Sequence, residues 1–216
     1  MKKLVILTAV LILNFNVKAY NDPYTIAMAK GMEMLATAQN PEDYLAVANQ
    51  FERIAKAETE KWQPSYYASF AMIILSANQS DPARIDQYLE VAQRFLDQAM
   101  AIKNDNAEIL ALQGFLYMVA IGVDPATRGQ QYSALSAAAL QKAQALDAEN
   151  PRVLHLLARL SYGTAMFFGS DTSMACQMND IAVKRFEATA ANHSADPFAP
   201  NWGKEMAIGF KNECSN

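Results

Sequence analysis

The chain has 216 residues, which is enough for one domain of ordinary size or a short array of repeats, and too few for a multidomain assembly. It holds only 8 glycines and 8 prolines, and it is rich in alanine and methionine, a composition that favours packed helices over strands. Hydrophobic residues make up 52% of the chain and charged residues 19%, which excludes a wholly disordered protein. We therefore expect an all-α fold.

The first 19 residues have the pattern of a secretory signal peptide. Lys2 and Lys3 are followed by an apolar run over 4–15 and by small residues at 17–19 that suit a cleavage site after Ala19. The apolar run is shorter than the ~20 residues that span a bilayer. We expect cleavage after Ala19, a mature chain of 20–216 in the periplasm or outside the cell, and no stable membrane insertion after cleavage.

The charge of the mature chain limits its partners. Loss of the three lysines before residue 20 leaves 15 basic and 22 acidic residues, a net charge of −7. Nucleic acid is excluded as a partner on this ground. The basic residues are also scattered along the sequence, which argues against a polybasic membrane-surface site.

Apolar residues spaced three and four apart predict amphipathic helices along the whole mature chain. Asn40, Asp81 and Asn150 each precede a proline, the pairing expected at the N-cap and first turn of a helix. The predicted helices lie near 23–38, 41–59, 64–78, 82–103, 107–121, 129–147, 151–167, 173–191 and 201–213.

Three of these helices begin with similar segments, 64–71, 107–114 and 151–158, which are 43 and 44 residues apart. Each carries a small residue at its eighth place, and each follows a second amphipathic stretch. The repeating unit is therefore a helix pair. We expect a solenoid of about four αα-hairpins with a C-terminal capping helix, in which Trp202, Met206 and Phe210 pack on the preceding pair.

The junction between two of these helices resembles the tetratricopeptide repeat (TPR), a helix-turn-helix unit of about 34 residues. Ala99, Ala107, Gly114 and Tyr117 stand where that family has its small residues, glycine and tyrosine. The longer period implies about ten extra residues per unit, which we expect in the turns at 78–81 and 122–129. The break over 124–132 is either a recognition loop or a simple connector.

The mature chain is also similar to a group of exported bacterial TPR-like proteins without an assigned activity. The similarity lies in 124–125, 128–130, 168–169 and 199–205. It implies a single TPR-like domain over 20–216, and it gives no activity to assign to this chain.

The TPR resemblance further implies a concave groove lined by the first helix of each pair. The groove positions of the family fall here on Glu108, Phe115, Met118, Arg152, His155, Arg159 and Tyr162. Such a groove would be apolar at one end and cationic and aromatic at the other, which suits an extended peptide or an acidic group. The alternative is structural: the arginines form ion pairs on a solvated face, while Phe115 and Met118 belong to the core.

The mature chain has two cysteines, Cys176 and Cys214, in a compartment that permits disulfides. The helix predicted after Cys176 and the helix predicted before Cys214 form two legs of similar length, so an antiparallel arrangement returns the thiols to each other. We predict a Cys176–Cys214 disulfide. The rival interpretation, a reactive or metal-binding thiol pair, lacks a CxxC spacing.

The sequence lacks the usual motifs of catalysis. His155 and His193 are the only histidines, and there is no HExxH, GxSxG or GxxxxGKS. We expect no enzyme, no metal and no cofactor. The prediction is an exported scaffold or assembly factor of the cell envelope that binds a protein or peptide. The alternative is a small-molecule binding protein that uses the groove, and an enzyme with an unfamiliar site is a third hypothesis.

Overall fold

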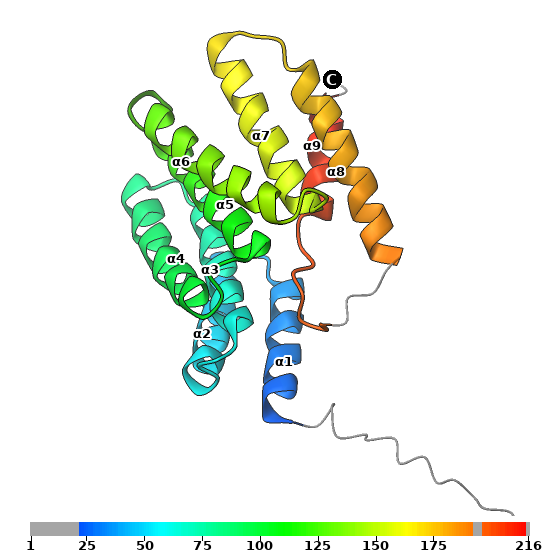
Figure 1. The fold of residues 1–216 in the computed structure, drawn as a ribbon. Helices are drawn as coiled ribbons and strands as arrows, with labels where there is room; N and C mark the ends of the chain where they lie inside the picture. Colours follow the sequence, from blue (N-terminus) through cyan, green and yellow to red (C-terminus); the bar gives the residue numbers. More distant parts are fainter. Residues whose placement is uncertain (1–21, 192–195, 215–216) are drawn as a thin grey trace, which may run out of the picture.

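The computed structural model describes residues 22–191 and 196–214. The predicted signal peptide at 1–19 and His193 lie outside these residues. The described part of the chain is all-α and has no strand, as predicted (Figure 1). Its helices are α1 (Pro23–Thr37), α2 (Pro41–Ala57), α3 (Trp62–Ala77), α4 (Pro82–Ile102), α5 (Ala107–Val123), α6 (Pro125–Leu146), α7 (Pro151–Phe168), α8 (Ser173–Ala191) and α9 (Lys204–Cys214).

Side-chain caps define most of the helix starts. Asn40 accepts a hydrogen bond from the amide of Asp43, whose carboxylate bonds back to the Asn40 amide in a capping box. The side chains of Asp22, Asp81, Asn106, Asp124 and Asn150 each accept a hydrogen bond from a first-turn backbone amide and so cap α1, α4, α5, α6 and α7. Every capped helix except α5 has a proline in its first turn. Proline suits this position because the first amide hydrogens of a helix have no partner within the helix.

The helices stack as antiparallel neighbours, and the most extensive contacts join α5 to α6, α3 to α4, α2 to α3 and α7 to α8 (Figure 1). α3 and α5 lie in the middle of the stack; α3 is buried along most of its length, and α5 along about half of its length. Gly114 in α5 allows α6 to approach closely: a Cβ at this position would lie 2.6 Å from Cγ of Leu140. This glycine is the one that carries the TPR resemblance, so the motif corresponds to a real contact between paired helices.

The prediction was wrong about where the extra residues of each repeat lie. α6 begins at Pro125, directly after its cap Asp124, so residues 125–132 are helical and no long connector separates α5 from α6. Arg128, at the start of α6, forms a bidentate ion pair with Asp86 of α4, with N···O distances of 2.6 and 2.8 Å. The longer period therefore comes from longer helices, such as the 22-residue α6, and not from longer turns.

The segment from 196 to 203 runs back across the stack before α9 begins (Figure 1). The hydroxyl of Tyr67 in α3 donates to the carbonyls of Phe198 and Ala199, at 3.3 and 3.0 Å. The indole of Trp202 donates to the Tyr66 hydroxyl at 2.7 Å. Phe198 and Trp202 are both buried in the main core.

Trp202 packs differently from the prediction. It precedes α9, which begins at Lys204, and its ring stacks between Phe70 of α3 and Phe115 of α5, with centroids 4.8 and 5.8 Å away. The C-terminal segment was predicted to cover only the preceding α7–α8 pair, but Trp202 reaches past that pair to α3 and α5 in the centre of the molecule. Phe210, which lies on α9 itself, is buried against Tyr162 of α7, as expected.

Candidate ligand-binding site

The two halves of α7 have different surroundings. In the first half, Pro151, Val153, His155, Leu156 and Ala158 are buried. In the second half, no residue from 161 to 168 is buried. Most of the predicted groove residues lie on the first half of α7 or face it from α5.

Glu108 and Arg152 form an ion pair beneath the C-terminal segment. Nε and Nη2 of Arg152 donate to the two carboxylate oxygens of Glu108 at 2.6 and 2.7 Å, and the Asn150 amide donates to the same carboxylate at 2.7 Å. The side chains of Arg152 and Glu108 are only 12% and 15% exposed. Arg152 also donates to the carbonyl of Trp202 at 3.2 Å. These contacts tie α5, α7 and the C-terminal segment together.

The electrostatics of this pair explain why a charge is tolerated there. Burial disfavours the charged guanidinium, but the hydrogen bonds and the negative charge of Glu108 outweigh burial and raise the pKa of Arg152.

Gly203 lies next to the pair with a positive φ of 101°. A Cβ there would lie 2.9 Å from the Phe186 ring and 3.1 Å from Cγ of Arg152, so glycine permits the close turn.

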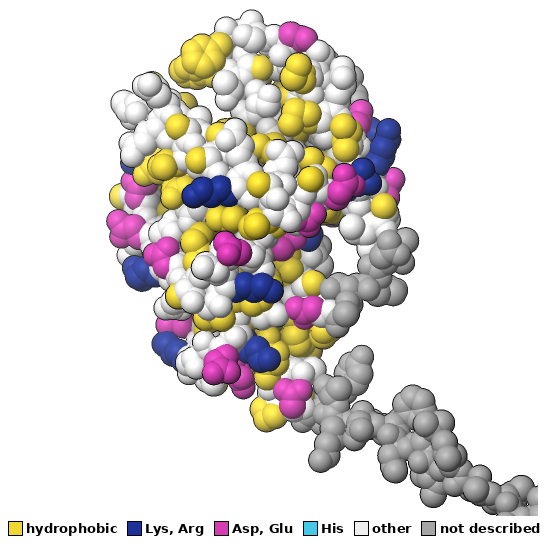
Figure 2. Space-filling model, in the orientation of Figure 1, with side chains coloured by type: hydrophobic (Ala, Val, Ile, Leu, Met, Phe, Trp, Pro, Cys, Tyr) yellow, Lys and Arg dark blue, Asp and Glu magenta, His cyan; other side chains and the backbone are white. Residues whose placement is uncertain are grey.

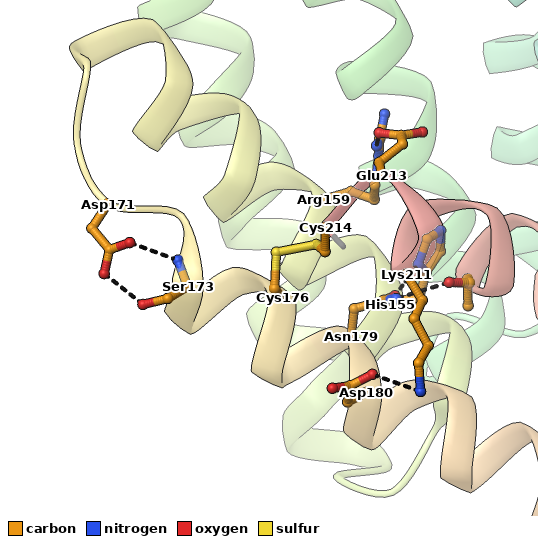
Figure 3. Close-up of a disulfide and its surroundings, with 11 residues drawn as sticks. His155, Arg159, Asp171, Ser173, Cys176, Asn179, Asp180, Lys211, Glu213 and Cys214 are labelled. Carbon is orange, nitrogen blue, oxygen red and sulfur yellow. Dashed lines mark hydrogen bonds and ion pairs between the residues drawn. A yellow bond between two sulfur atoms is a disulfide. The ribbon is translucent and has the colours of Figure 1, made fainter. Parts of the chain in front are cut away.

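His155 is buried and hydrogen-bonded between α7, α8 and α9. Its Nδ1 lies 2.8 Å from Oδ1 of Asn179, and Nδ2 of Asn179 donates to the carbonyl of Ala207 at 2.8 Å (Figure 3). Because that amide nitrogen faces a carbonyl, the Asn179 oxygen is the acceptor and Nδ1 of His155 carries the proton. Burial lowers the pKa of His155 below its ordinary value of 6.5. A neutral imidazole in this place is part of the packing between helices.

A small cavity of about 210 Å³ remains on this face of the molecule. Its lining includes four of the predicted groove residues: Phe115, Met118, His155 and Arg159, together with Val119, Leu156 and Met206. Arg159 is paired with Glu213 of α9 at 2.7 Å and lies over the Phe210 ring, 4.6 Å from its centroid. α9 and the segment before it therefore cover much of the predicted groove, and the use of this face for binding stays a prediction.

The Cys176–Cys214 disulfide is confirmed. The sulfurs are bonded, the Cα atoms are 5.8 Å apart, and the bridge joins the first turn of α8 to the last turn of α9 (Figure 3). The rival interpretation of a reactive or metal-binding pair is therefore wrong. The bridge lies beside the Arg159–Glu213 ion pair and holds α9 against α7 and α8 (Figure 3). A disulfide agrees with export to an oxidising compartment.

A larger cavity, of about 470 Å³, lies between α7 and α8, and the sequence analysis did not find it. It is a hollow that is largely open to solvent, so a ligand held there would keep part of its surface exposed. Apolar side chains dominate its lining, with a few hydroxyl groups between them. The lining residues are Leu157, Leu160, Ser161, Thr164, Ala165, Phe168, Ser170 and Met178. We call it the α7–α8 cavity.

Exposed apolar side chains surround the outer end of the α7–α8 cavity. Phe167 and Phe168 are 64% and 73% exposed, and Met166 and Met174 are similarly open. Figure 2 shows hydrophobic side chains protruding over the C-terminal end of α7. Gly169, with a φ of 65°, ends the helix there and turns the chain toward α8. Large apolar groups exposed together mark interaction or ligand sites.

The sequence carries a signal for this surface: Met166-Phe167-Phe168 is an apolar run directly before the glycine that ends a helix. From periodicity alone, such a run would be predicted to lie in the hydrophobic core.

In the described residues, no group of three or more His, Cys, Asp or Glu side chains is placed to hold a metal ion. No described helix combines the length and the apolar character needed to cross a membrane.

Comparison with known proteins supports the helical-repeat architecture. No protein-family model matches the chain, and no curated protein matches it. Among solved structures, the chain is similar to the HusA haemophore from Porphyromonas gingivalis, with a TM-score of 0.78 and 27% identity over 91% of this chain and 94% of that one. A thermophilic TPR protein from Thermus thermophilus matches with a TM-score of 0.40 and 15% identity, over 89% of this chain and 98% of that one. With its stacked helix pairs and the TPR glycine at the contact of α5 with α6, the described part of the chain has a TPR-like helical-repeat fold.

Proposed function

We propose that this chain is a non-enzymatic, exported carrier that binds haem, or a flat ligand like it, in the α7–α8 cavity. The observation that carries the proposal is the similarity to a haemophore, a haem-carrying protein, at 27% identity over nearly the full length of both chains. Export is supported by the disulfide and by the signal-peptide pattern of the first 19 residues.

The chemistry of the α7–α8 cavity fits such a ligand. A porphyrin presents two broad apolar faces, and Leu157, Leu160, Phe168 and Met178 offer an apolar surface between two helices. The Phe168 ring is 73% exposed and contacts the Phe167 ring edge to face, with centroids 5.2 Å apart, so most of its surface is open for stacking on a flat ligand. Burial of these exposed groups by a ligand would supply the hydrophobic part of the affinity.

The donors available to haem iron are limited in this cavity. Among the lining residues, the thioether of Met178 is a known type of axial ligand. His155 is buried on the other side of α7 and hydrogen-bonded to Asn179. We therefore expect affinity to depend mainly on apolar contact and on Met178, and not on a histidine.

Titration of the purified mature chain with haem, followed through the haem absorption band, tests the proposal. Phe168→Ser should weaken binding about tenfold, because it removes an aromatic contact from the cavity lining. Met166→Ser is the matched control, since Met166 is 60% exposed and does not line the cavity, and we expect less than a threefold effect. Failure of the wild-type chain to bind haem, or equal losses in both variants, would contradict the proposal.

Binding of a protein or peptide, the function expected from the sequence, is the second candidate. The exposed group of Met166, Phe167, Phe168 and Met174 favours it, since a partner would cover this surface. The predicted groove favours it less, because Trp202 and α9 lie over much of that face. If cross-linking in intact cells captures a specific partner that Phe167→Ser loses while haem does not bind, this second candidate replaces the first.

A further inference from the structure

One face of α8 runs from the α7–α8 cavity to the positively charged side chain of Arg185. Met174, Met178, Ile181 and Arg185 are spaced four, three and four residues apart, so they lie along one side of the helix. Met178 lines the cavity, and Met174 and Ile181 are exposed on either side of it. The buried residues Ala175, Asn179, Ala182 and Phe186 lie on the adjacent side of α8, about 100° around the helix from this stripe. An apolar stripe therefore runs along the open face of α8 and ends at Arg185.

The distance along this stripe suits a ligand of porphyrin size. Arg185 lies seven positions after Met178, which corresponds to about 10 Å along the helix axis. Side chains on a helix lean toward its N-terminus, and for Arg185 that direction leads toward Ile181 and the cavity. The guanidinium can therefore meet a group at the edge of a ligand whose ring lies against Met178.

Arg185 has a partner that a ligand can replace. It forms an ion pair with Glu149, which lies in the connection between α6 and α7. The two side chains are 46% and 64% exposed, and an ion pair in such a setting contributes little to stability. The other charged residues nearby on α8 lie on different sides: Asp180 pairs with Lys211 of α9, and Lys184 lies about 100° around the helix from Arg185.

We propose that Arg185 binds the carboxylate groups of the ligand held in the α7–α8 cavity, exchanging Glu149 for them. A guanidinium binds a carboxylate through two parallel hydrogen bonds, which gives both strength and orientation. The apolar stripe would hold the ring, and Arg185 would hold its acidic edge. The site is thus specific for an amphipathic acid, such as a porphyrin with propionate side chains, over a neutral ligand of the same shape. This assignment rests on the proposed function.

Haem and its dimethyl ester provide the test, because they share the iron and the ring and differ only in the carboxylates. Arg185→Gln should weaken the binding of haem about tenfold and leave the affinity for the ester unchanged within twofold. Glu149→Gln should strengthen the binding of haem about threefold, because it removes the competing carboxylate. Lys184→Gln is the matched control: it removes the neighbouring positive charge and should change neither affinity.

The outcomes separate the two proposals. If the wild-type chain binds haem and Arg185→Gln binds it equally well, the assignment of Arg185 is overturned while the proposed function stands. If Arg185→Gln weakens haem and ester by the same factor, the residue acts through the fold and the assignment is again overturned. If the wild-type chain binds neither compound, the proposed function fails, and the assignment fails with it.

Discussion

The two halves of α7 differ in their surroundings: the first half is enclosed by other elements, and the second half presents exposed apolar side chains. The first half is enclosed by α5, α8, α9 and the segment before α9, and its polar side chains Arg152 and His155 are bonded to neighbouring elements. The second half carries apolar side chains that no described element covers, and it forms one wall of the α7–α8 cavity. The comparison teaches that the polar residues of this helix hold the fold together, whereas its exposed apolar residues are available to a ligand.

The largest expected effect is on the enclosed half. Arg152→Ala removes one member of a pair whose side chains are 12% and 15% exposed, and it leaves Glu108 buried without its cation. Loss of one partner of a buried ion pair typically costs about 3–5 kcal/mol. We expect a loss of that size in the free energy of unfolding, measured by urea denaturation.

Arg159→Ala is the control for this effect. Arg159 also pairs across helices, but its side chain and that of Glu213 are substantially exposed, so we expect a loss below about 1 kcal/mol. Equal losses in the two variants would contradict the distinction between an enclosed and an exposed pair on the same helix.

The disulfide should have the next largest effect. It closes a loop of 38 residues and ties α9 to α8, so the Cys176→Ser/Cys214→Ser double variant should lose about 2–4 kcal/mol of stability. Hydrogen exchange should then rise in α9 first, because α9 is a terminal helix. An unchanged exchange rate in α9 would show that Trp202 and Phe210 alone hold the C-terminal segment in place.

A smaller effect concerns pH. Burial lowers the pKa of His155, so the unfolded chain binds a proton at this residue more readily than the folded chain does. The stability from the neutral imidazole is fully present above pH 6.5 and is lost as pH falls from there toward the lower folded-state pKa, by at most about 1.4 kcal/mol per pH unit. Urea denaturation between pH 7.5 and 5 should show this decline.

His155→Gln should flatten that decline, because it keeps a hydrogen-bonding side chain and removes the titrating group. A His193→Gln variant measures separately what the other imidazole contributes. A decline that persists unchanged in His155→Gln would contradict the assignment to His155. The hydrogen-bonded carboxylate of Asp86, whose pKa is lowered chiefly by Arg128, affects stability only at lower pH, as pH falls below about 4.

Local signals predicted the helices well but misplaced two starts, those of α6 and α9. Asn40 and Asp81, each followed by proline, marked helix starts that the structure confirms. Asp124-Pro125 is the same signal, but nearby glycines led to the prediction of a connector, and α6 begins at Pro125. Gly129 lies inside the helix with open space around it. A glycine weakens a helix by only about 1 kcal/mol, and the capped first turn outweighs it.

The candidate site depends on contacts that no local pattern contains. Trp202 reaches Tyr66 across 136 residues of sequence, and this contact brings the C-terminal segment over the predicted groove. In the same way, the apolar run from 166 to 168 predicts burial, and only the arrangement of α7 and α8 leaves it open. The disulfide was predictable because two cysteines allow one pairing and the helix lengths agree with it.

Hydrogen exchange of the mature chain with and without haem tests the central claim most directly, because it reports on both halves of α7 in one experiment. The account predicts that haem increases protection in the second half of α7 and along α8 from 174 to 181. Residues 151–158 and the segment from 196 to 203 should keep the exchange rates of the ligand-free protein. Protection centred on that segment and on the first half of α7 would place the ligand in the covered groove and contradict the account.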